Sequence, residues 1–254
     1  MLRRWYECHG RHDLPWRTTR ARWPVLVSEV MLHQTQVARV AATWPAFMDE
    51  FPTPATMAAG GPGAVIAAWG RLGYPRRARR LWEAAVVVAG QGWPDDLTDL
   101  PGIGRYTAAA IAAQADGADV VAFDVNVRRV VQRAAGRRLG NRDADAFARD
   151  LGGSLTGRDR LLALMDVGAL LCRPRAPRCY ECPLRPSCAS RGPLAGERRS
   201  TQGRFEGSFR QRRGRVLAEL RAGPAAARAL DPEALASLVA DGLASIDGPT
   251  ARLP

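Results

Sequence analysis

The sequence predicts an all-α protein, and two observations support that prediction. Apolar residues recur at helical spacing across residues 26–41 and 161–170, and alanine, arginine and leucine, which favour helices, are abundant. Alternating patterns typical of strands are scarce; the short apolar run 120–123 fits either a strand or a buried extended loop. The length of 254 residues suits one or two domains with their own cores.

The charge balance points to nucleic acid as the partner. The chain carries 37 basic against 25 acidic residues, a net charge of +12, and every basic residue is arginine. A GC-rich coding bias explains arginine in place of lysine, but the excess charge still predicts a polyanion. No apolar run approaches a membrane span and no signal peptide is recognisable, so we expect no membrane contact and a cytoplasmic, nucleoid-associated protein with reduced thiols.

Residues 100–107 have the Leu-Pro-Gly-x-Gly form of a helix-hairpin-helix turn. Gly102 and Gly104 permit a tight turn with positive φ, and they leave backbone N–H groups facing outward where the next helix begins. Such groups suit a DNA phosphate. The same pattern also occurs as an ordinary turn, so both interpretations stay open at this point.

Asp124 follows the apolar run at residues 120–123 and precedes a helical pattern. A carboxylate beside apolar residues is partly desolvated, which suits catalysis. The alternative is an N-cap of a helix over residues 127–135. The two roles are compatible.

Four of the five cysteines form a C-x6-C-x2-C-x5-C run: Cys172, Cys179, Cys182 and Cys188. In a reducing compartment this clustering favours a metal centre over disulfides. Only one pair has the spacing of a zinc knuckle, and the uneven intervals favour a 4Fe-4S cluster over zinc. Cys8 lies far from the run, and we expect it to be a buried thiol.

Residues 193–213 are rich in glycine, serine and arginine and predict a basic linker. Beyond it, residues 215–221 and 232–243 have helical patterns, and the last ten residues fit a hairpin. Two helices and a hairpin predict a small winged-helix-like domain over residues 214–254. A plain helical tail is the alternative.

The hairpin, Asp124 and the cysteine run, in this order, resemble the iron–sulfur branch of the helix-hairpin-helix DNA glycosylases. Within that branch, the chain resembles the adenine DNA glycosylases of the MutY type. The matching stretches are Leu14–Arg17, Val27–Leu32, Gln34–Val37, Leu72–Tyr74 followed by Arg77–Arg79, and Met165–Ala169. The resemblance covers residues 1–190. It implies a two-lobed fold, with a six-helix module over residues 20–130 and a cluster domain from residues 1–19 and 131–192. The family's usual Nudix-like C-terminal domain is not expected in residues 193–254.

The resemblance implies a monomeric glycosylase that removes adenine mispaired with 8-oxoguanine or guanine from double-stranded DNA. Glu29 would be the general acid, kept protonated by a pocket that raises its pKa. Asp124 would stabilise the oxocarbenium-like sugar, flanked by Tyr106 and Asn126. Bifunctional relatives carry a lysine nucleophile at the position of Tyr106. Because this chain has no lysine, we expect base excision without efficient strand cleavage.

The resemblance also implies binding residues. Trp16 and Arg17 would line the base pocket, and Tyr74 would insert beside the opposite base. The arginines of residues 71–80 are expected on phosphates, with a solvated helix face as the alternative. The predicted DNA contacts are His33, Gln34, Thr35, Tyr74, Arg77, Gly102, Gly104 and Arg105.

Three positions depart from the family pattern. His33 replaces a glutamine, Pro75 replaces a second tyrosine, and Val125 replaces a glycine beside the catalytic aspartate. These changes keep two alternatives open: a glycosylase for another mispaired or modified base, and a non-catalytic iron–sulfur DNA-binding regulator.

Overall fold

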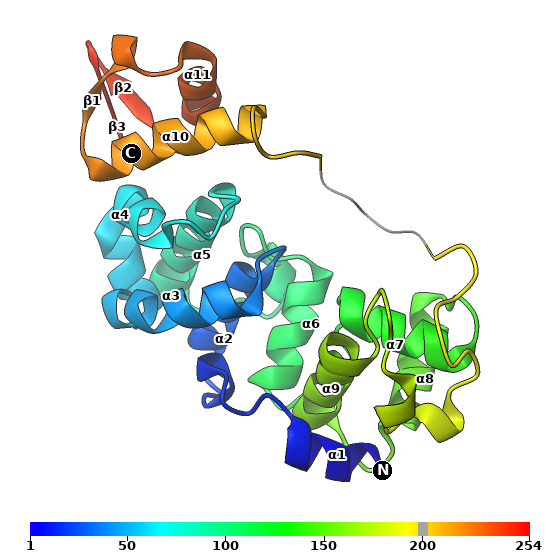
Figure 1. The fold of residues 1–254 in the computed structure, drawn as a ribbon. Helices are drawn as coiled ribbons and strands as arrows, with labels where there is room; N and C mark the ends of the chain where they lie inside the picture. The colour runs from blue at the N-terminus through cyan, green and yellow to red at the C-terminus, as the bar shows by residue number, and fades with distance from the viewer. Residues whose placement is uncertain (198–202) are drawn as a thin grey trace. The chain divides into compact units, whose positions relative to one another are not determined.

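The computed structural model describes residues 1–197 and 203–254 and confirms a mainly helical chain (Figure 1). Two compact units are present: Met1–Leu26 with Gly104–Ser200, and Val27–Ile103 with Thr201–Pro254. Helices α6 and α7 fall in the first unit because they pack on α9, so the units do not coincide with the predicted boundaries near residues 19 and 130. Among the described residues, no helix is long and apolar enough to span a bilayer.

The first unit is built around α9 (Gly157–Asp166), whose residues are mostly buried. Around it lie α1 (Leu2–His9), α6 (Arg105–Gln114), α7 (Val125–Ala135) and α8 (Asn141–Gly152). The π-helical segment η3 (Val167–Leu171) continues α9. Short 3-10 turns complete the unit: η1 (Pro15–Arg17), η4 (Cys179–Glu181) and η5 (Arg185–Ser187).

A glycine lets η3 approach α7 closely. A Cβ added at Gly168 would lie 2.7 Å from the Cβ of Asn126 and 3.0 Å from its backbone. Real Cβ atoms do not come this close, so any larger residue would force the two segments apart. Gly168 therefore fixes the distance between the segment that precedes the cysteine run and the start of α7.

The run at residues 120–123 is a buried extended loop, the second of the two predicted alternatives. Val121 and Ala122 are buried, and α7 begins directly after Asp124. The helix starts two residues earlier than predicted because Asp124 caps it at Val125 rather than Val127.

In the second unit, the apolar pattern of residues 26–41 is divided between two helices. Helix α2 (Arg22–Leu32), which begins in the first unit, ends before a turn at residues 33–36, and α3 (Val37–Glu50) follows. Gln34 takes a φ of 55°, which no helix accommodates. Helix α4 (Pro54–Trp69), kinked at Gly61, packs along α5 (Arg76–Gln91), and η2 (Leu97–Asp99) leads into the hairpin turn.

The C-terminal part contains α10 (Phe209–Ala222), η6 (Ala227–Ala229) and α11 (Pro232–Ala240). Strands β1 (Ala225–Ala226), β2 (Ser245–Asp247) and β3 (Thr250–Arg252) form an antiparallel sheet in the order β1-β3-β2. The predicted terminal hairpin is thus confirmed, with Ile246 opposite Ala251. Helix α10 begins inside the predicted linker, and residues 198–202 of that linker lie outside the described residues. The winged-helix assignment stays a prediction.

Candidate active site

The carboxylate of Asp124 is held at the N-terminus of α7. Its Oδ1 accepts hydrogen bonds from the backbone N–H groups of Asn126 (2.9 Å) and Val127 (2.7 Å), and its Oδ2 accepts one from Asn126 Nδ2 (2.8 Å). The helix dipole favours an anion at this position. Both predicted roles, helix cap and oriented carboxylate, are therefore compatible with the geometry.

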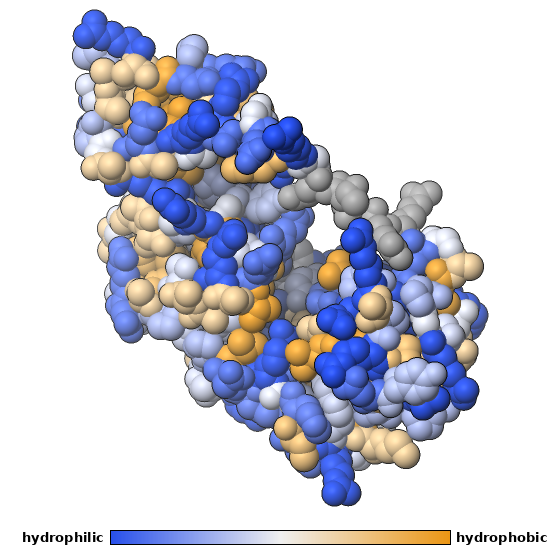
Figure 2. Space-filling model, viewed as in Figure 1, coloured by the Kyte–Doolittle hydropathy of each residue, from blue (hydrophilic) through white to orange (hydrophobic). Residues whose placement is uncertain are grey.

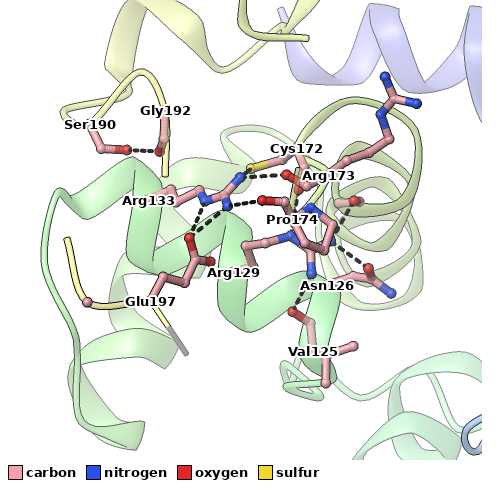
Figure 3. A network of polar contacts seen from close by, with 12 residues as sticks. Val125, Asn126, Arg129, Arg133, Cys172, Arg173, Pro174, Ser190, Gly192 and Glu197 are labelled. Atoms are coloured by element: carbon pink, nitrogen blue, oxygen red, sulfur yellow. Dashed lines mark hydrogen bonds and ion pairs between the residues drawn. The ribbon is translucent and has the colours of Figure 1, made fainter. Parts of the chain in front are cut away.

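Asn126 is itself anchored through Arg129, a residue that the sequence did not single out. Arg129 Nη2 donates to Asn126 Oδ1 (2.7 Å) and to the carbonyl of Gly168 (2.7 Å), and its Nε donates to the carbonyl of Cys172 (2.6 Å) (Figure 3). A continuous chain of hydrogen bonds thus joins Asp124 to the backbone of the first cysteine in the run. The only sequence signal was the position of Arg129, three residues after Asn126 on one helix face.

The four clustered cysteines line one cavity of about 30 Å³. Burial raises the pKa of Cys172, and it raises that of Cys182 to about 11. Among the described residues, no group of three or more histidine, cysteine or acidic side chains is arranged to hold a metal ion. Cys8, which we expected to be buried, is exposed because α1 turns it away from the core.

A buried arginine supports this cavity. Arg133 is 2% exposed, and its Nη1 lies 3.7 Å from Cys172 Sγ (Figure 3). Its Nη2 donates to Glu197 (2.7 Å), and Cys188 Sγ donates to the Arg133 carbonyl (3.6 Å). The cavity wall is therefore positively charged next to the sulfur atoms, which suits a group held by thiolates.

Glu29 lies in the middle of α2 and is 5% exposed, with Ser28 beside it also buried. A solvated surface glutamate, the ordinary interpretation of such a residue, is thus excluded. Acidic side chains are rarely buried without a functional or structural reason. Tyr106, in the first turn of α6, is partly buried against the core of the first unit.

Arg17 does not have the contacts expected of a base-pocket residue. Its side chain is 4% exposed, and it donates to both oxygens of the fully buried Asp166 at 2.7 and 2.8 Å. Arg11 adds a third charged contact at 2.6 Å. Burial raises the pKa of Asp166, but the hydrogen bonds and charges of these arginines outweigh burial and hold that pKa below its usual value. Trp16 is also buried, and its predicted role remains a prediction.

In the hairpin turn, only one of the two glycines has the predicted positive φ. Gly102 has a φ of 79°, whereas Gly104 has a φ of −99° and forms the N-cap of α6. An N-cap normally takes extended backbone, which any residue can adopt. Gly104 and Arg105 are exposed at the start of the helix, where backbone N–H groups lack intrahelical partners.

The other predicted DNA contacts lie in two turns of the second unit. His33, Gln34 and Thr35 form the turn between α2 and α3, and Tyr74, which is 40% exposed, precedes α5. His33 and Arg77 also line a cavity of about 110 Å³ with the exposed Arg76 and Arg80. Burial lowers the pKa of His33, and the nearby charge of Arg77 lowers it further. The guanidinium of Arg77 is directed into the protein.

Comparisons with known proteins agree with the resemblance drawn from the sequence. Residues 27–149 match the model of the HhH-GPD superfamily base excision DNA repair proteins. The chain is 46% identical to an adenine DNA glycosylase of Mycolicibacterium smegmatis over 85% of this chain and 78% of that protein. It is 42% identical to an adenine DNA glycosylase of Mycobacterium tuberculosis over 96% of this chain and 90% of that one.

Among solved structures, a thermostable thymine-DNA glycosylase superposes with a TM-score of 0.67 at 29% identity, covering 75% of this chain and 92% of that chain. This likeness confirms the expected helix-hairpin-helix glycosylase fold. Taken with the identity to the mycobacterial enzymes over most of both lengths, it shows that the chain belongs to the adenine DNA glycosylase family of the HhH-GPD superfamily.

Proposed function

We propose that the chain hydrolyses the N-glycosidic bond of adenine mispaired with 8-oxoguanine or guanine in double-stranded DNA. The observation that carries the proposal is the pair of carboxylates: Glu29 buried in α2 and Asp124 held at the start of α7. Their environments differ, which suits two different roles in one reaction. The choice of adenine as the excised base rests on the relatives, which are named adenine DNA glycosylases.

The reaction begins when the adenine leaves the duplex stack for a protein pocket, at a cost of a few kcal/mol. The carboxyl group of Glu29, shielded from water, donates a proton to an imidazole nitrogen of the base, so that adenine departs neutral. Asp124, fixed by its three hydrogen bonds, faces the positive charge that develops on the sugar. Water then completes the hydrolysis. With no lysine in the chain, no side-chain amine is available for a Schiff base, so we expect the abasic strand to stay intact.

Cys172, Cys179, Cys182 and Cys188 would hold a 4Fe-4S cluster. Four thiols line one cavity, and their uneven spacing in the sequence, with a single C-x2-C pair, fits a multi-iron group better than zinc. When bound, such a cluster would supply a rigid cross-link within residues 172–188, which contain only the short turns η4 and η5. The buried charge of Arg133 would stabilise its thiolates.

Altered base specificity is the second candidate function. Val125 is 76% exposed directly beside Asp124, at a position where the family pattern has glycine. A regulator without catalysis is disfavoured, because binding DNA requires neither a buried Glu29 nor a capped Asp124.

Single-turnover assays on a panel of duplexes test both candidates. The panel carries adenine opposite 8-oxoguanine, guanine or cytosine, together with T:G and U:G pairs. We expect adenine release to fall at least ~100-fold in Glu29→Gln and in Asp124→Asn, as for a lost general acid or a lost charge in the transition state. Glu7→Gln, an exposed carboxylate on α1, is the matched control.

Three outcomes distinguish adenine excision, altered base specificity and the absence of catalysis. Release of adenine, with no covalent product after borohydride treatment, supports the proposal. Release of thymine or uracil instead of adenine supports altered specificity. No base release from any duplex by protein with a full complement of iron rejects catalysis.

A further inference from the structure

Arg77 joins two turns that are far apart in the sequence. Its Nη1 donates to carbonyls at the end of α2 and in the turn that follows, and its Nη2 donates to the side chain of Thr35 (2.9 Å). Nη2 also donates to the turn before α5. The accepting carbonyls are those of Val30 (2.7 Å), Met31 (3.0 Å), His33, Leu72 (3.4 Å) and Gly73 (3.0 Å).

Two aromatic rings surround the same guanidinium. Arg77 Cζ lies 5.3 Å from the ring centroid of the buried Trp69 and 5.4 Å from that of the exposed Tyr74. The indole N–H of Trp69 donates to the carbonyl of Gly73 at 3.0 Å. The charge of Arg77 thus stabilises the position of the Tyr74 ring as well as the backbone of its turn.

Each of the two turns contains a non-glycine residue in the left-handed region. Gln34 has a φ of 55° and Tyr74 has a φ of 49°. Such conformations persist only where surrounding contacts over-determine them, and they concentrate at functional sites. Thr35 Oγ1 also donates to the carbonyl of Leu72 (3.2 Å), so the turns are linked directly as well as through Arg77.

The hydrogen bonds leave Arg77 little capacity for a phosphate. Both of its terminal nitrogens are engaged with protein acceptors, and burial lowers its pKa to about 10, so the guanidinium remains charged at neutral pH. Arg76 and Arg80, on the same helix, are exposed; each pairs through one terminal nitrogen with a carboxylate, Asp241 or Glu83, and their exposure suits phosphate contact better. The sequence-based prediction grouped all three together.

We propose that Arg77 is a positioning residue that locks the turn at residues 33–35 to the turn at residues 72–74. His33 and Tyr74 then act as one unit in recognising the base opposite the adenine. The inference rests on the proposed adenine excision, and it adds a specificity determinant that need not contact DNA.

The test compares Arg77→Met and Arg77→Lys with Arg80→Met, in the iron-loaded enzyme. Two quantities are measured: the ratio of single-turnover rates for adenine opposite 8-oxoguanine and opposite cytosine, and the slope of log Kd against log salt. We expect Arg77→Met to lower the rate ratio about tenfold and to leave the slope unchanged. Arg80→Met should reduce the slope by about 1 and keep the ratio.

Arg77→Lys should not restore the ratio, because one ammonium group cannot reach acceptors in both turns. Thr35→Val removes one acceptor of Arg77 and the direct hydrogen bond to the Leu72 carbonyl with little change in volume, so it keeps the test valid if Arg77→Met unfolds. It should lower the ratio about threefold. Wild-type ratios in Thr35→Val and in a folded Arg77 variant, or a salt slope reduced by about 1 in Arg77→Met, would overturn the inference.

A binding measurement separates this failure from failure of the proposed function. Kd is measured for the wild type and the variants on duplexes with adenine opposite 8-oxoguanine and with fully paired bases. If the wild type releases no adenine, the proposed function fails. The ratio of the two Kd values still reports whether Arg77 sets the recognition of the opposite base, and an unchanged ratio in the variants overturns its positioning role.

Discussion

Replacing Arg129 with methionine should slow base excision and also destabilise the first unit. The guanidinium donates to the Cys172 and Gly168 carbonyls, to Asn126 Oδ1 and, at 3.2 Å, to the Val125 carbonyl. Methionine matches the length of the aliphatic part of the arginine side chain but donates no hydrogen bond. Three acceptors within 2.7 Å would lose a charged donor, and at about 1 kcal/mol for each partly buried acceptor the loss is about 3 kcal/mol in unfolding free energy.

The effect on rate follows from Asn126. Without Arg129, its amide loses the contact that fixes Oδ1, so the donor that holds Asp124 Oδ2 is free to rotate. A catalytic group displaced by an ångström costs up to about 100-fold, so we expect a 10- to 100-fold slower single turnover. Arg129→Lys should recover part of the stability, since its single ammonium reaches fewer of the acceptors.

Arg128→Met is the matched control for both measurements. Arg128 lies on the same helix, but its contacts within the described residues are fewer: it donates to Asn141 Oδ1 (3.2 Å) and stacks on Phe123 at 5.4 Å. Urea unfolding, visible absorbance and single-turnover rates are measured for each variant. A folded Arg129→Met enzyme with a wild-type rate would refute the coupling between Asn126 and Asp124. An unchanged unfolding free energy would refute the loss of about 3 kcal/mol assigned to the hydrogen bonds of Arg129.

Two further perturbations probe the support of the site. Asp166→Asn should lower the unfolding free energy by about 3–5 kcal/mol, because it leaves buried arginine charge without a counter-ion, whereas the exposed Asp247→Asn should change it little. The folded pKa of Asp166 lies below the unfolded value of about 3.9, so this stabilisation is complete above that value and disappears as pH falls through the folded pKa. A difference in unfolding free energy between wild type and Asp166→Asn that grows below about pH 4 would contradict this expectation. Gly168→Ala should cost about 1–3 kcal/mol and slow excision by displacing Asn126, and a wild-type melting temperature would show that η3 yields instead.

The parts of the fold that sequence could predict are those set by local chemistry. Helical spacing identified the helices, and Asp124 was recognisable as a cap because a cap bonds to residues two and three positions away. The break at residues 33–36 was missed because the apolar pattern runs through it, and only the left-handed Gln34 reveals the turn. Gly104 was assigned the wrong φ because a glycine in a turn can adopt a positive φ but does not have to.

The candidate site was predictable where a motif carried it and hidden where partners are distant in sequence. Glu29 and the cysteine run were found from their neighbours. The partners of Arg129 and Arg133 lie about 40 residues away, and Asp166 binds arginines about 150 residues earlier. No spacing rule connects such positions, so only the folded chain reveals these contacts.

The positive charge of the sequence is therefore divided between two uses. Exposed arginines such as Arg76 and Arg80 face solvent, and Figure 2 shows hydrophilic residues over much of the viewed face. Buried arginines instead join segments by donating several hydrogen bonds at once; the largely buried Arg158 donates to the carbonyls of Thr19, Gln114 and Arg17. Lysine, with one compact ammonium group, could not bridge acceptors spread over such distances. A coding bias toward arginine thus has a structural consequence, because a buried guanidinium that joins protein segments by hydrogen bonds cannot also contact a DNA phosphate.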